Sequence, residues 1–284
     1  KAFDIANVVI LALVGLAALY PFWYTLVLSV SSASEAMRVG LHLFPREISF
    51  TSYRMVLTNR DILTGYQNTL FRTVVGTVLT LIATCLAAYP LSRRELPHRR
   101  LFILAILFTM IFSGGIVPIY LLIKNIGLMN SRWSLILPML LTAFNIIVMK
   151  NFFQTLPESF AESARIDGAS EFTILFRIYV PLSKPVIATI ALWTAVLHWN
   201  KWVDAMLFIN DNSKQVLQIF LQRIVIESST QMIEKGLVDP DITQFTPDTI
   251  KAATVIVTVL PILCFYPFVQ RYFTKGILLG GIKE

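Results

Sequence analysis

The chain has 284 residues, of which 56% are hydrophobic and 14% are charged, and its formal net charge at pH 7 is +7. Such a large apolar share exceeds what the core of an ordinary soluble domain contains, so the composition argues against a soluble globular protein. It favours an integral membrane protein. The two cysteines, Cys85 and Cys264, fall in apolar runs and therefore indicate small apolar fillers, not a disulfide framework.

Six apolar runs are long enough to cross a bilayer as helices. The hydrocarbon core is about 30 Å thick and needs roughly 20 residues of helix, which pairs every backbone polar group internally. We expect an all-α integral membrane fold, with one domain over residues 1–284 and six spans at about residues 8–30, 68–91, 101–123, 133–153, 181–203 and 249–270. The first run is too long for the apolar part of a signal peptide and is interpreted as a retained span. Numbering begins at Lys1 without a methionine, which suggests a trimmed N-terminus.

The arginines between the second and third spans predict the orientation. Residues 92–100, SRRELPHRR, carry four of them. Because short cytoplasmic loops are enriched in Lys and Arg, this segment and both chain termini are predicted to be cytoplasmic. Residues 154–180 then face the cytoplasm, and residues 31–67 and 204–248 face outward. The rule is weaker for the first outer loop, which contains Arg38, Arg46, Arg54 and Arg60.

The usual signatures of a nucleotide-binding or catalytic protein are missing. The sequence has no phosphate-binding G-x-x-x-x-G-K-[ST] loop and no G-x-G-x-x-G motif. Its three histidines, His42, His98 and His198, are scattered and lack partners at metal-ligand spacing. We therefore expect no catalytic residue, metal site or cofactor in this chain. If its transport is uphill, the energy must enter through a partner or an ion gradient.

The inward loop of residues 154–180 contains a polar island, PESFAESARIDGAS. A first helix is predicted from Pro157, with Glu158 and Glu162 near its positive end. Gly168 should end it, and Ser170 should cap a second helix. The apolar side chains of that second helix recur at helical spacing and predict one apolar stripe: Phe172, Leu175, Phe176 and Tyr179. Small residues near the bend allow another backbone to approach closely: Ala161, Ala164, Gly168 and Ala169.

This island resembles a known motif. E-x-A-x-x-D-G-A, followed by I-x-x-P-L-x-K-P, is similar to the "EAA" coupling motif of ABC importer permeases, with Ser163 in place of the alanine at the middle position of that name. The stretches FSGGIVPIYLLIKNIGLMNSRWSLILP and HWNKWVDAMLFI resemble carbohydrate-importer permeases related to the smaller permease of the maltose transporter. Within that group they are most similar to the second permease subunits of bacterial alginate oligosaccharide importers.

The resemblance implies a type I ABC importer permease in a bacterial inner membrane. Its expected partners are a second related permease, two cytoplasmic ATPase subunits that bind ATP and Mg, and an extracytoplasmic solute-binding protein, with no role for nucleic acid. The loop would contact the ATPases through Glu158, Glu162, Ala164, Arg165, Asp167, Gly168 and Ala169. The C-terminal tail would enter the ATPase interface through Gly280, Gly281 and Lys283.

Two further clusters leave alternatives open. Ser113, Gly114 and Gly115 interrupt the third apolar run, which indicates either close helix packing or a broken helix that lines the pathway. A second cluster ends the fifth run and consists of His198, Trp199, Asn200 and Trp202. Its aromatic residues are typical of interfacial anchors, but rings beside hydrogen-bonding groups also suit a sugar pathway or gate.

The second outer loop contains an amphipathic stretch between Gln215 and Ser228. One helical face would be apolar, with Leu217, Phe220, Leu221, Ile224 and Val225. Such a helix packs on its own domain or, as the resemblance implies, docks the binding protein. The docking candidates are Gln215, Gln218, Gln222 and Arg223, together with the acidic stretch of residues 237–248.

The expected function is the transport of an oligosaccharide, with alginate or another polyuronate fragment as the first candidate. Outward-facing arginines would attract an anionic substrate. A neutral oligosaccharide is the alternative. More distant alternatives are an ion-coupled secondary transporter and a membrane-embedded enzyme, although acids at the span centres and convergent catalytic groups are not apparent.

Overall fold

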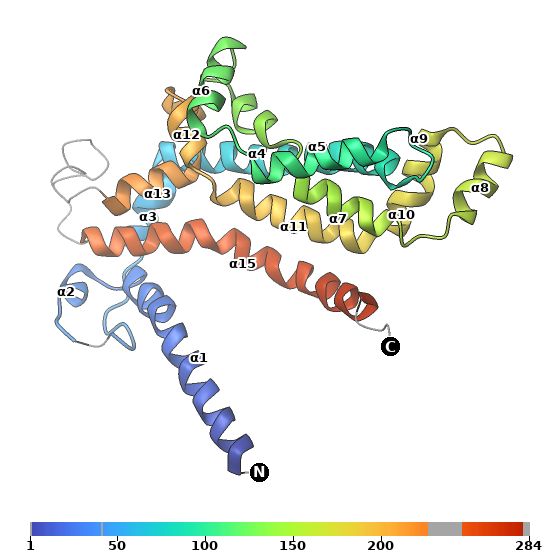
Figure 1. The fold of residues 1–284 in the computed structure, drawn as a ribbon. Coiled ribbons are helices and arrows are strands. Elements are labelled where there is room, and N and C mark those ends of the chain that lie inside the picture. The colour runs from blue at the N-terminus through green and yellow to red at the C-terminus, as the bar shows by residue number, and fades with distance from the viewer. Residues whose placement is uncertain (1, 41, 227–245, 281–284) are drawn as a thin grey trace. The chain divides into compact units, whose positions relative to one another are not determined.

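A computed structural model describes residues 2–40, 42–226 and 246–280 of the chain. Every regular element in these ranges is helical, and the only strand-like pairing in them is an isolated antiparallel bridge between Ser31 and Ile48 (Figure 1). The chain divides into two compact units, residues 1–66 with 217–263 and residues 67–216 with 264–284. Each unit is described by itself.

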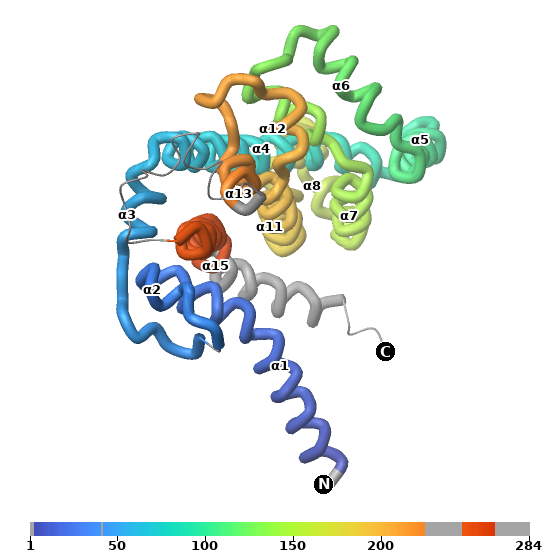
Figure 2. Tube along the Cα trace, turned by 90° about the vertical axis from the view of Figure 1, so that its left-hand side faces the viewer, coloured from blue at the N-terminus to red at the C-terminus, as the bar shows by residue number. Residues whose placement is uncertain are grey.

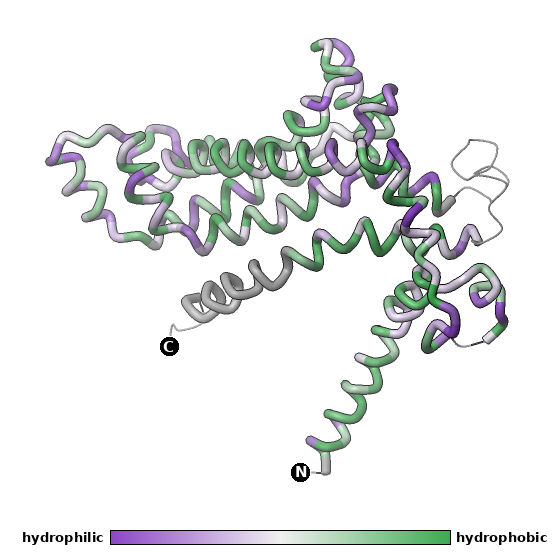
Figure 3. The backbone as a smooth tube through the Cα atoms, turned by 180° about the vertical axis from the view of Figure 1, so that it is seen from behind, coloured by the Kyte–Doolittle hydropathy of each residue, from purple (hydrophilic) through white to green (hydrophobic). Residues whose placement is uncertain are grey.

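The first unit contains α1 (Ala2–Ser29), α2 (Ala33–Ala36), α3 (Thr51–Thr58), α13 (Leu217–Ile226), the first turns of α4 (Arg60–Ser92) and the greater part of α15 (Pro247–Gly280). Gly65 lets α4 approach α13, since a Cβ added there would come within 2.9 Å of the Phe220 ring. Ser52 donates a hydrogen bond to Thr249 Oγ1 over 2.9 Å and joins α3 to α15. Hydrophobic residues run along α1 (Figure 3), whose 18-residue apolar window has no buried residue.

The second unit is built around α4, α7 (Ala143–Phe153) and α11 (Lys184–Asn200), which run side by side (Figure 1). Its other helices include α5 (Arg99–Ile111), α6 (Ile116–Asn125), α8 (Ser159–Ile166), α9 (Glu171–Ile174), α10 (Val180–Leu182) and α12 (Val203–Phe208). Short 3-10 turns lie at Arg132–Leu135, Leu137–Met139 and Asn212–Lys214, and a π-helical turn at Leu175–Tyr179 joins α9 to α10. Figure 2 shows the Cα trace of these helices in a view turned by 90° from Figure 1.

The apolar core of the second unit lies where α4, α7, α8, the segment from α9 to Tyr179, and α11 meet. Its members include Ala88, Met149, Ala161, Ile174 and Ile190, each with no exposed surface. Tyr89, Phe153 and Tyr179 meet edge to face, with ring centroids 5.2 to 6.4 Å apart. Aromatic pairs favour this geometry. The core thus fixes the inward loop to the ends of α4 and α7.

Three helices in the described part of the chain are long and apolar enough to cross a membrane: Phe3–Ser29, Arg60–Ser92 and Pro247–Cys264. Three bent pairs meet the same criteria together: residues 99–111 with 116–125, residues 132–139 with 143–153, and residues 171–182 with 184–200. If each pair is one span, the total is up to six. The division into one domain with six spans stays a prediction.

The bends refine the predicted spans. The third predicted span is broken, because α5 ends at Ile111 and α6 begins at Ile116 with a bend of 110° between them. Gly115 has a φ of +82°, a left-handed conformation that glycine adopts at little cost. This break has the geometry of the broken-helix alternative for Ser113, Gly114 and Gly115. Their role in the pathway stays a prediction.

The fifth predicted span contains a bend near its start. The chain bends by 83° between residues 171–182 and residues 184–200, so the straight helix starts at Lys184 and not at Pro181. Pro185 follows at the start of α11, where a backbone N–H is not needed.

Candidate functional site

The inward loop forms two helices joined by a tight turn, as its sequence predicts. Gly168 has a φ of +78°, and its N–H donates to the Arg165 carbonyl over 3.0 Å. The N–H of Ala169 donates to the Ala164 carbonyl over 2.9 Å. These two bonds close a Schellman motif, which needs glycine at the left-handed position. Ser170 then caps α9 by accepting a hydrogen bond from the Thr173 N–H over 3.3 Å.

The start of the first loop helix differs from the prediction. The helix α8 begins at Ser159, two residues after Pro157, and Glu158 is its N-cap residue. The Glu158 side chain makes no capping hydrogen bond, but its carbonyl accepts from the Glu162 N–H over 3.1 Å. Glu158 and Glu162 are both exposed, and both lie at the start of α8, near the positive end of its helix dipole.

The predicted apolar stripe of the second loop helix is buried in only half of its members. Leu175 and Tyr179 are buried, but Phe172 is 68% exposed and Phe176 is 43% exposed. The reason is the π-helical turn at Leu175–Tyr179, which widens the helix and puts Ile174 in the core beside Leu175. The two exposed phenylalanines thus belong to the outer surface of the loop.

The small residues of the loop face the permease itself. Ala161 is fully buried in the core, and Ala164 and Ala169 pack against it. Ala164 and Ala169 are thus partly covered within this chain, and their contact with an ATPase subunit stays a prediction. The opposite face of the loop is exposed and carries Glu158, Glu162 and Asp167. It also carries Phe160 and Ile166, which are 47% and 87% exposed. Exposed apolar side chains on a short polar helix are typical of a contact surface, and the sequence analysis did not single out these two.

A network of five polar side chains ties the loop to the end of α4. We call it the loop clamp: Tyr89, Arg93, Glu95, Arg165 and Glu171. The Arg165 Nε donates to Glu171 Oε1 over 2.8 Å, and the Tyr89 hydroxyl donates to Glu171 Oε2 over 2.6 Å. The hydrogen bond from Tyr89 and then that from Arg165 hold the pKa of the Glu171 carboxyl below its usual range. Glu171 therefore accepts as a carboxylate from both loop and α4.

Arginines complete the loop clamp on both sides. Arg93 donates to the Tyr89 hydroxyl over 2.8 Å, and its guanidinium lies 4.8 and 4.7 Å from the ring centres of Tyr89 and Tyr179. Arg165 also lies 3.7 Å from Glu95 Oε2. The guanidinium of Arg165 is thus engaged inside the permease, although the sequence reading assigned it to ATPase contact.

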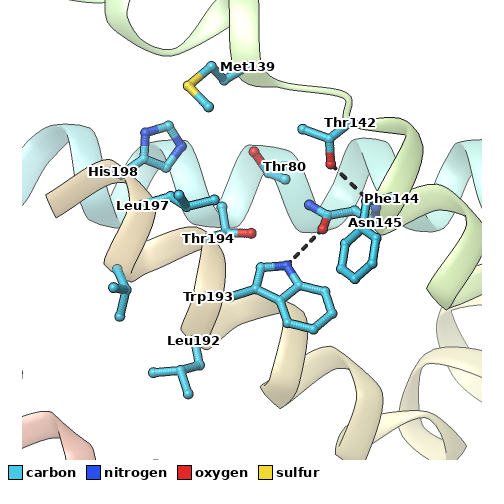
Figure 4. Close-up of a pocket in the computed structure, with 11 residues that line it drawn as sticks. Thr80, Met139, Thr142, Phe144, Asn145, Leu192, Trp193, Thr194, Leu197 and His198 are labelled. Carbon is cyan, nitrogen blue, oxygen red and sulfur yellow. Dashed lines mark hydrogen bonds between the residues drawn. The ribbon is translucent and has the colours of Figure 1, made fainter. Parts of the chain in front are cut away.

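A second site lies along α4, α7 and α11, where a cavity of about 630 Å³ opens. Figure 4 shows Trp193 directed at Asn145, whose Oδ1 accepts from the Trp193 Nε1 over 2.7 Å. Thr80, Thr194 and His198 also line the cavity. Their Oγ1, Oγ1 and Nδ1 atoms are buried without a hydrogen-bond partner in the described part of the chain.

His198 owes its position to a close helix crossing. A Cβ added at Gly76 would lie 2.6 Å from His198 Nε2, so only glycine lets α4 approach α11 so closely. The other members of the predicted gate are dispersed. Trp199 is buried, and Asn200 is exposed with its amide donating to the Val196 carbonyl over 3.0 Å. Neither Trp199, Asn200 nor Trp202 lines the cavity. Sequence reasoning missed Asn145 and Trp193, which are single polar or aromatic residues in apolar runs.

A charged group that sequence reasoning also missed lies beside this cavity. We call it the buried charge cluster: Arg72, Lys201 and Asp204. Arg72, 1% exposed, donates to the Asp204 carboxylate and, over 2.8 Å, to the Lys201 carbonyl. The Lys201 ammonium lies 3.7 Å from Asp204 Oδ2. Arg72 and Asp204 stand at the ends of apolar runs, 132 positions apart, so no local pattern links them.

The predicted docking residues fall in two groups. Gln215 and Gln218 are buried, 4% and 8% exposed, and the Gln215 amide donates to the Ile209 carbonyl over 2.6 Å. The chain's own packing covers both side chains, and their role in docking stays a prediction. Gln222 and Arg223 are partly exposed. Residues 237–245 of the acidic stretch lie outside the described residues. Among the predicted tail contacts, Gly281 and Lys283 also lie outside them, and Gly280 is the last residue of α15.

Residues 62–278 match the family of "binding-protein-dependent transport system inner membrane component" proteins, and the chain belongs to this family. Together with the relatives described in the next paragraph, this match shows that the chain is an ABC importer permease for a sugar or oligosaccharide, located in the inner membrane, and not an enzyme. This result confirms the predicted all-α type I permease fold and the carbohydrate-permease resemblance. It excludes the secondary-transporter and enzyme alternatives.

Particular relatives are similar over their whole length. The protein LplC of Bacillus subtilis (strain 168) is 40% identical over 287 residues, which cover 100% of this chain and 95% of LplC. The polygalacturonan/rhamnogalacturonan transport system permease protein YtcP of the same organism is also 40% identical, with 100% and 99% covered. A crystal structure of a bacterial ABC transporter involved in the import of the acidic polysaccharide alginate contains a chain with a TM-score of 0.89 and 35% identity, with 96% of each chain covered.

Proposed function

We propose that this permease carries acidic oligosaccharides, and that fragments of alginate or of another polyuronate are its substrate. Two of the relatives support this class. YtcP is named for polygalacturonan and rhamnogalacturonan, and the similar crystal structure is of an importer of the acidic polysaccharide alginate. Galacturonan and alginate both carry carboxylates on their sugar rings. A neutral oligosaccharide is the competing substrate.

The coupling role of the inward loop is supported by one observation above all: the two faces of α8 are chemically different. The inner face is fixed by Ala161 in the core and by Arg165 in the loop clamp. The outer face presents Glu158, Glu162 and Ile166 to the surroundings. A helix held rigidly on one side and exposed on the other can pass the movement of a docked partner to the membrane helices.

The proposed assembly pairs this chain with a second related permease and two cytoplasmic ATPase subunits, which bind ATP and Mg. Glu158, Glu162, Asp167 and Gly168 would contact an ATPase subunit, with both chain termini in the cytoplasm. A tail contact through Gly280, Gly281 and Lys283 belongs to the same proposal. Outside, Gln222 and Arg223 remain the candidates for docking of a solute-binding protein.

The substrate class is tested with the complete transporter in proteoliposomes. ATP hydrolysis is measured with the binding protein and either oligouronates or neutral glucans of equal length. We expect stimulation by oligouronates only. Stimulation by neutral glucans alone would overturn the acidic-substrate proposal.

The coupling role is tested with Glu162→Lys, which reverses one charge on the exposed face of α8. We expect less ATPase subunit to copurify with the permease and uptake to fall about tenfold, since loss of a charge-assisted contact costs about 1.5–3 kcal/mol. Glu47→Lys makes the same charge change on the predicted outer loop and is the matched control. Equal copurification and uptake in the two variants would refute a docking role for Glu162.

A further inference from the structure

The buried charge cluster contains more positive than negative charge. Arg72 and Lys201 contribute two cations, whereas Asp204 is the only carboxylate that pairs with them among the described residues. The Arg72 side chain is 1% exposed and the Asp204 side chain 9% exposed. Charges in such an environment are normally paired, because taking them out of water is costly. One more anion would therefore neutralise the net positive charge of the cluster.

Lys201 is the more weakly paired of the two cations. Arg72 already engages the Asp204 carboxylate through a direct hydrogen bond. The Lys201 ammonium lies 3.7 Å from that carboxylate, which is beyond hydrogen-bond distance. Its nearest neighbour is the Met139 sulfur at 2.6 Å, and a thioether is only a weak acceptor. With 36% of its side chain exposed, Lys201 can still reach another anion.

The cavity of about 630 Å³ is lined by Met139 and His198 (Figure 4). Lys201 is not one of its lining residues, but its ammonium contacts the Met139 sulfur at the edge of the cavity. Ligand sites in proteins commonly have volumes of about 300–1,000 Å³ and combine apolar walls with a few polar groups. Here the walls are mostly aliphatic and aromatic. The partnerless hydroxyls of Thr80 and Thr194 and the Nδ1 of His198 supply hydrogen-bonding groups.

We infer that Lys201 is a specificity-determining residue that binds the carboxylate of a uronate unit at this cavity. The inference rests on the proposed acidic substrate and adds a residue to it. The aromatic rings of Phe144 and Trp193 suit the face of a sugar ring, while the ammonium selects for the charged substituent. A neutral sugar would occupy the same space without that contact. Lys201 thus distinguishes acidic from neutral sugars by charge.

The test uses the complete transporter in proteoliposomes with its binding protein. Uptake of an oligogalacturonate is compared with uptake of its methyl ester, which has the same rings without the charge. We expect Lys201→Met to lower the ratio of acid to ester uptake about tenfold, because the loss of a hydrogen bond between two charged groups weakens binding by about that factor. We expect Lys201→Arg to leave the ratio unchanged. Lys214→Met is the matched control, because the Lys214 ammonium contacts Asp211 and the Asn130 carbonyl, neither of which belongs to a residue that lines the cavity.

Other outcomes separate the inference from its premises. If Lys201→Met slows both substrates equally, Lys201 has a structural role and the inference is overturned. A second measurement uses the free acid alone, where Lys201→Gln should lose uptake and Lys201→Arg should retain it. Equal uptake by these two variants also overturns the inference. If the wild-type transporter responds to neutral glucans and not to oligouronates, the proposed substrate itself fails, whatever the variants do.

Discussion

Two ion-pair networks lie on the same helix and differ in almost every physical respect. The loop clamp is centred on Tyr89 and the buried charge cluster on Arg72, about 25 Å apart along α4 at 1.5 Å per residue. The paired side chains of the loop clamp are 33–73% exposed, whereas Arg72 and Asp204 are 1% and 9% exposed. Exposed pairs contribute little free energy, but a broken buried pair leaves a charge in a low-dielectric environment.

This difference separates two roles for the same chemistry. The loop clamp has several partially redundant contacts, so it orients the loop without dominating the free energy of unfolding. Arg72 and Asp204 join α4 to the break between α11 and α12, and this buried pair tolerates no missing partner. We therefore expect variants of Arg72 or Asp204 to affect stability first, and variants in the clamp to affect the coupling between ATP hydrolysis and transport first.

The largest expected effect is that of Asp204→Asn. This change leaves the Arg72 guanidinium buried without its carboxylate and should destabilise the protein by about 3–5 kcal/mol. The measurement is the thermal unfolding of the assembled transporter in detergent, followed by tryptophan fluorescence. The double variant Arg72→Met with Asp204→Leu replaces both charges by apolar groups and should recover most of the loss. A single variant as stable as the double variant would refute the buried-pair argument.

A smaller loss is expected for Gly76→Ala at the same crossing of α4 and α11. The added Cβ would meet the His198 ring at 2.6 Å, and overpacking of this kind costs about 1–3 kcal/mol. Gly15→Ala in α1 is the matched control, because nothing lies within 4 Å of that position. Thermal unfolding of both variants measures the difference. Introducing His198→Ala into Gly76→Ala should restore stability, and failure to do so would locate the strain elsewhere.

The smallest effect on stability is expected for Glu171→Gln in the loop clamp, at about 0.2–1 kcal/mol. Its main consequence should be uncoupling, measured as sugar transported per ATP hydrolysed. Tyr89→Phe removes the partner hydroxyl and should have the same effect. Because Tyr89 and Glu171 share one hydrogen bond, the loss in the double variant should be smaller than the sum of the two single losses. Additive losses would mean that the two residues act independently.

The loop clamp also predicts a pH dependence. Its hydrogen bonds lower the pKa of the Glu171 carboxyl in the folded state. The stabilisation is therefore complete above the ordinary glutamate pKa of about 4.3 and is lost as the pH falls through the lowered value. Wild type and Glu171→Gln should differ at neutral pH and converge in strong acid, as thermal unfolding across pH will test. A constant difference at all pH values would exclude the carboxylate as its source.

Features that depend on neighbouring residues were predictable from the sequence. The turn at Gly168 and the cap at Ser170 follow from the conformational freedom of glycine and from the hydrogen-bonding reach of a serine hydroxyl. The interruption at Gly115 was visible for the same reason, although the sequence left packing and a broken helix as alternatives. The membrane class followed from the length and polarity of the apolar runs.

Features that depend on distant residues were decided only by the tertiary structure. Arg72 and Asp204 meet across 132 positions, so neither residue by itself indicates a buried pair. Phe172 and Phe176 fit an ideal helical stripe, but the π-helical turn and the packing against α4 placed Ile174 in the core instead. Gln215 and Gln218 are polar and still buried, because nearby backbone and side chains cover them. Local conformation is fixed by bonds a few residues apart, whereas burial and charge pairing depend on which distant surfaces pack together.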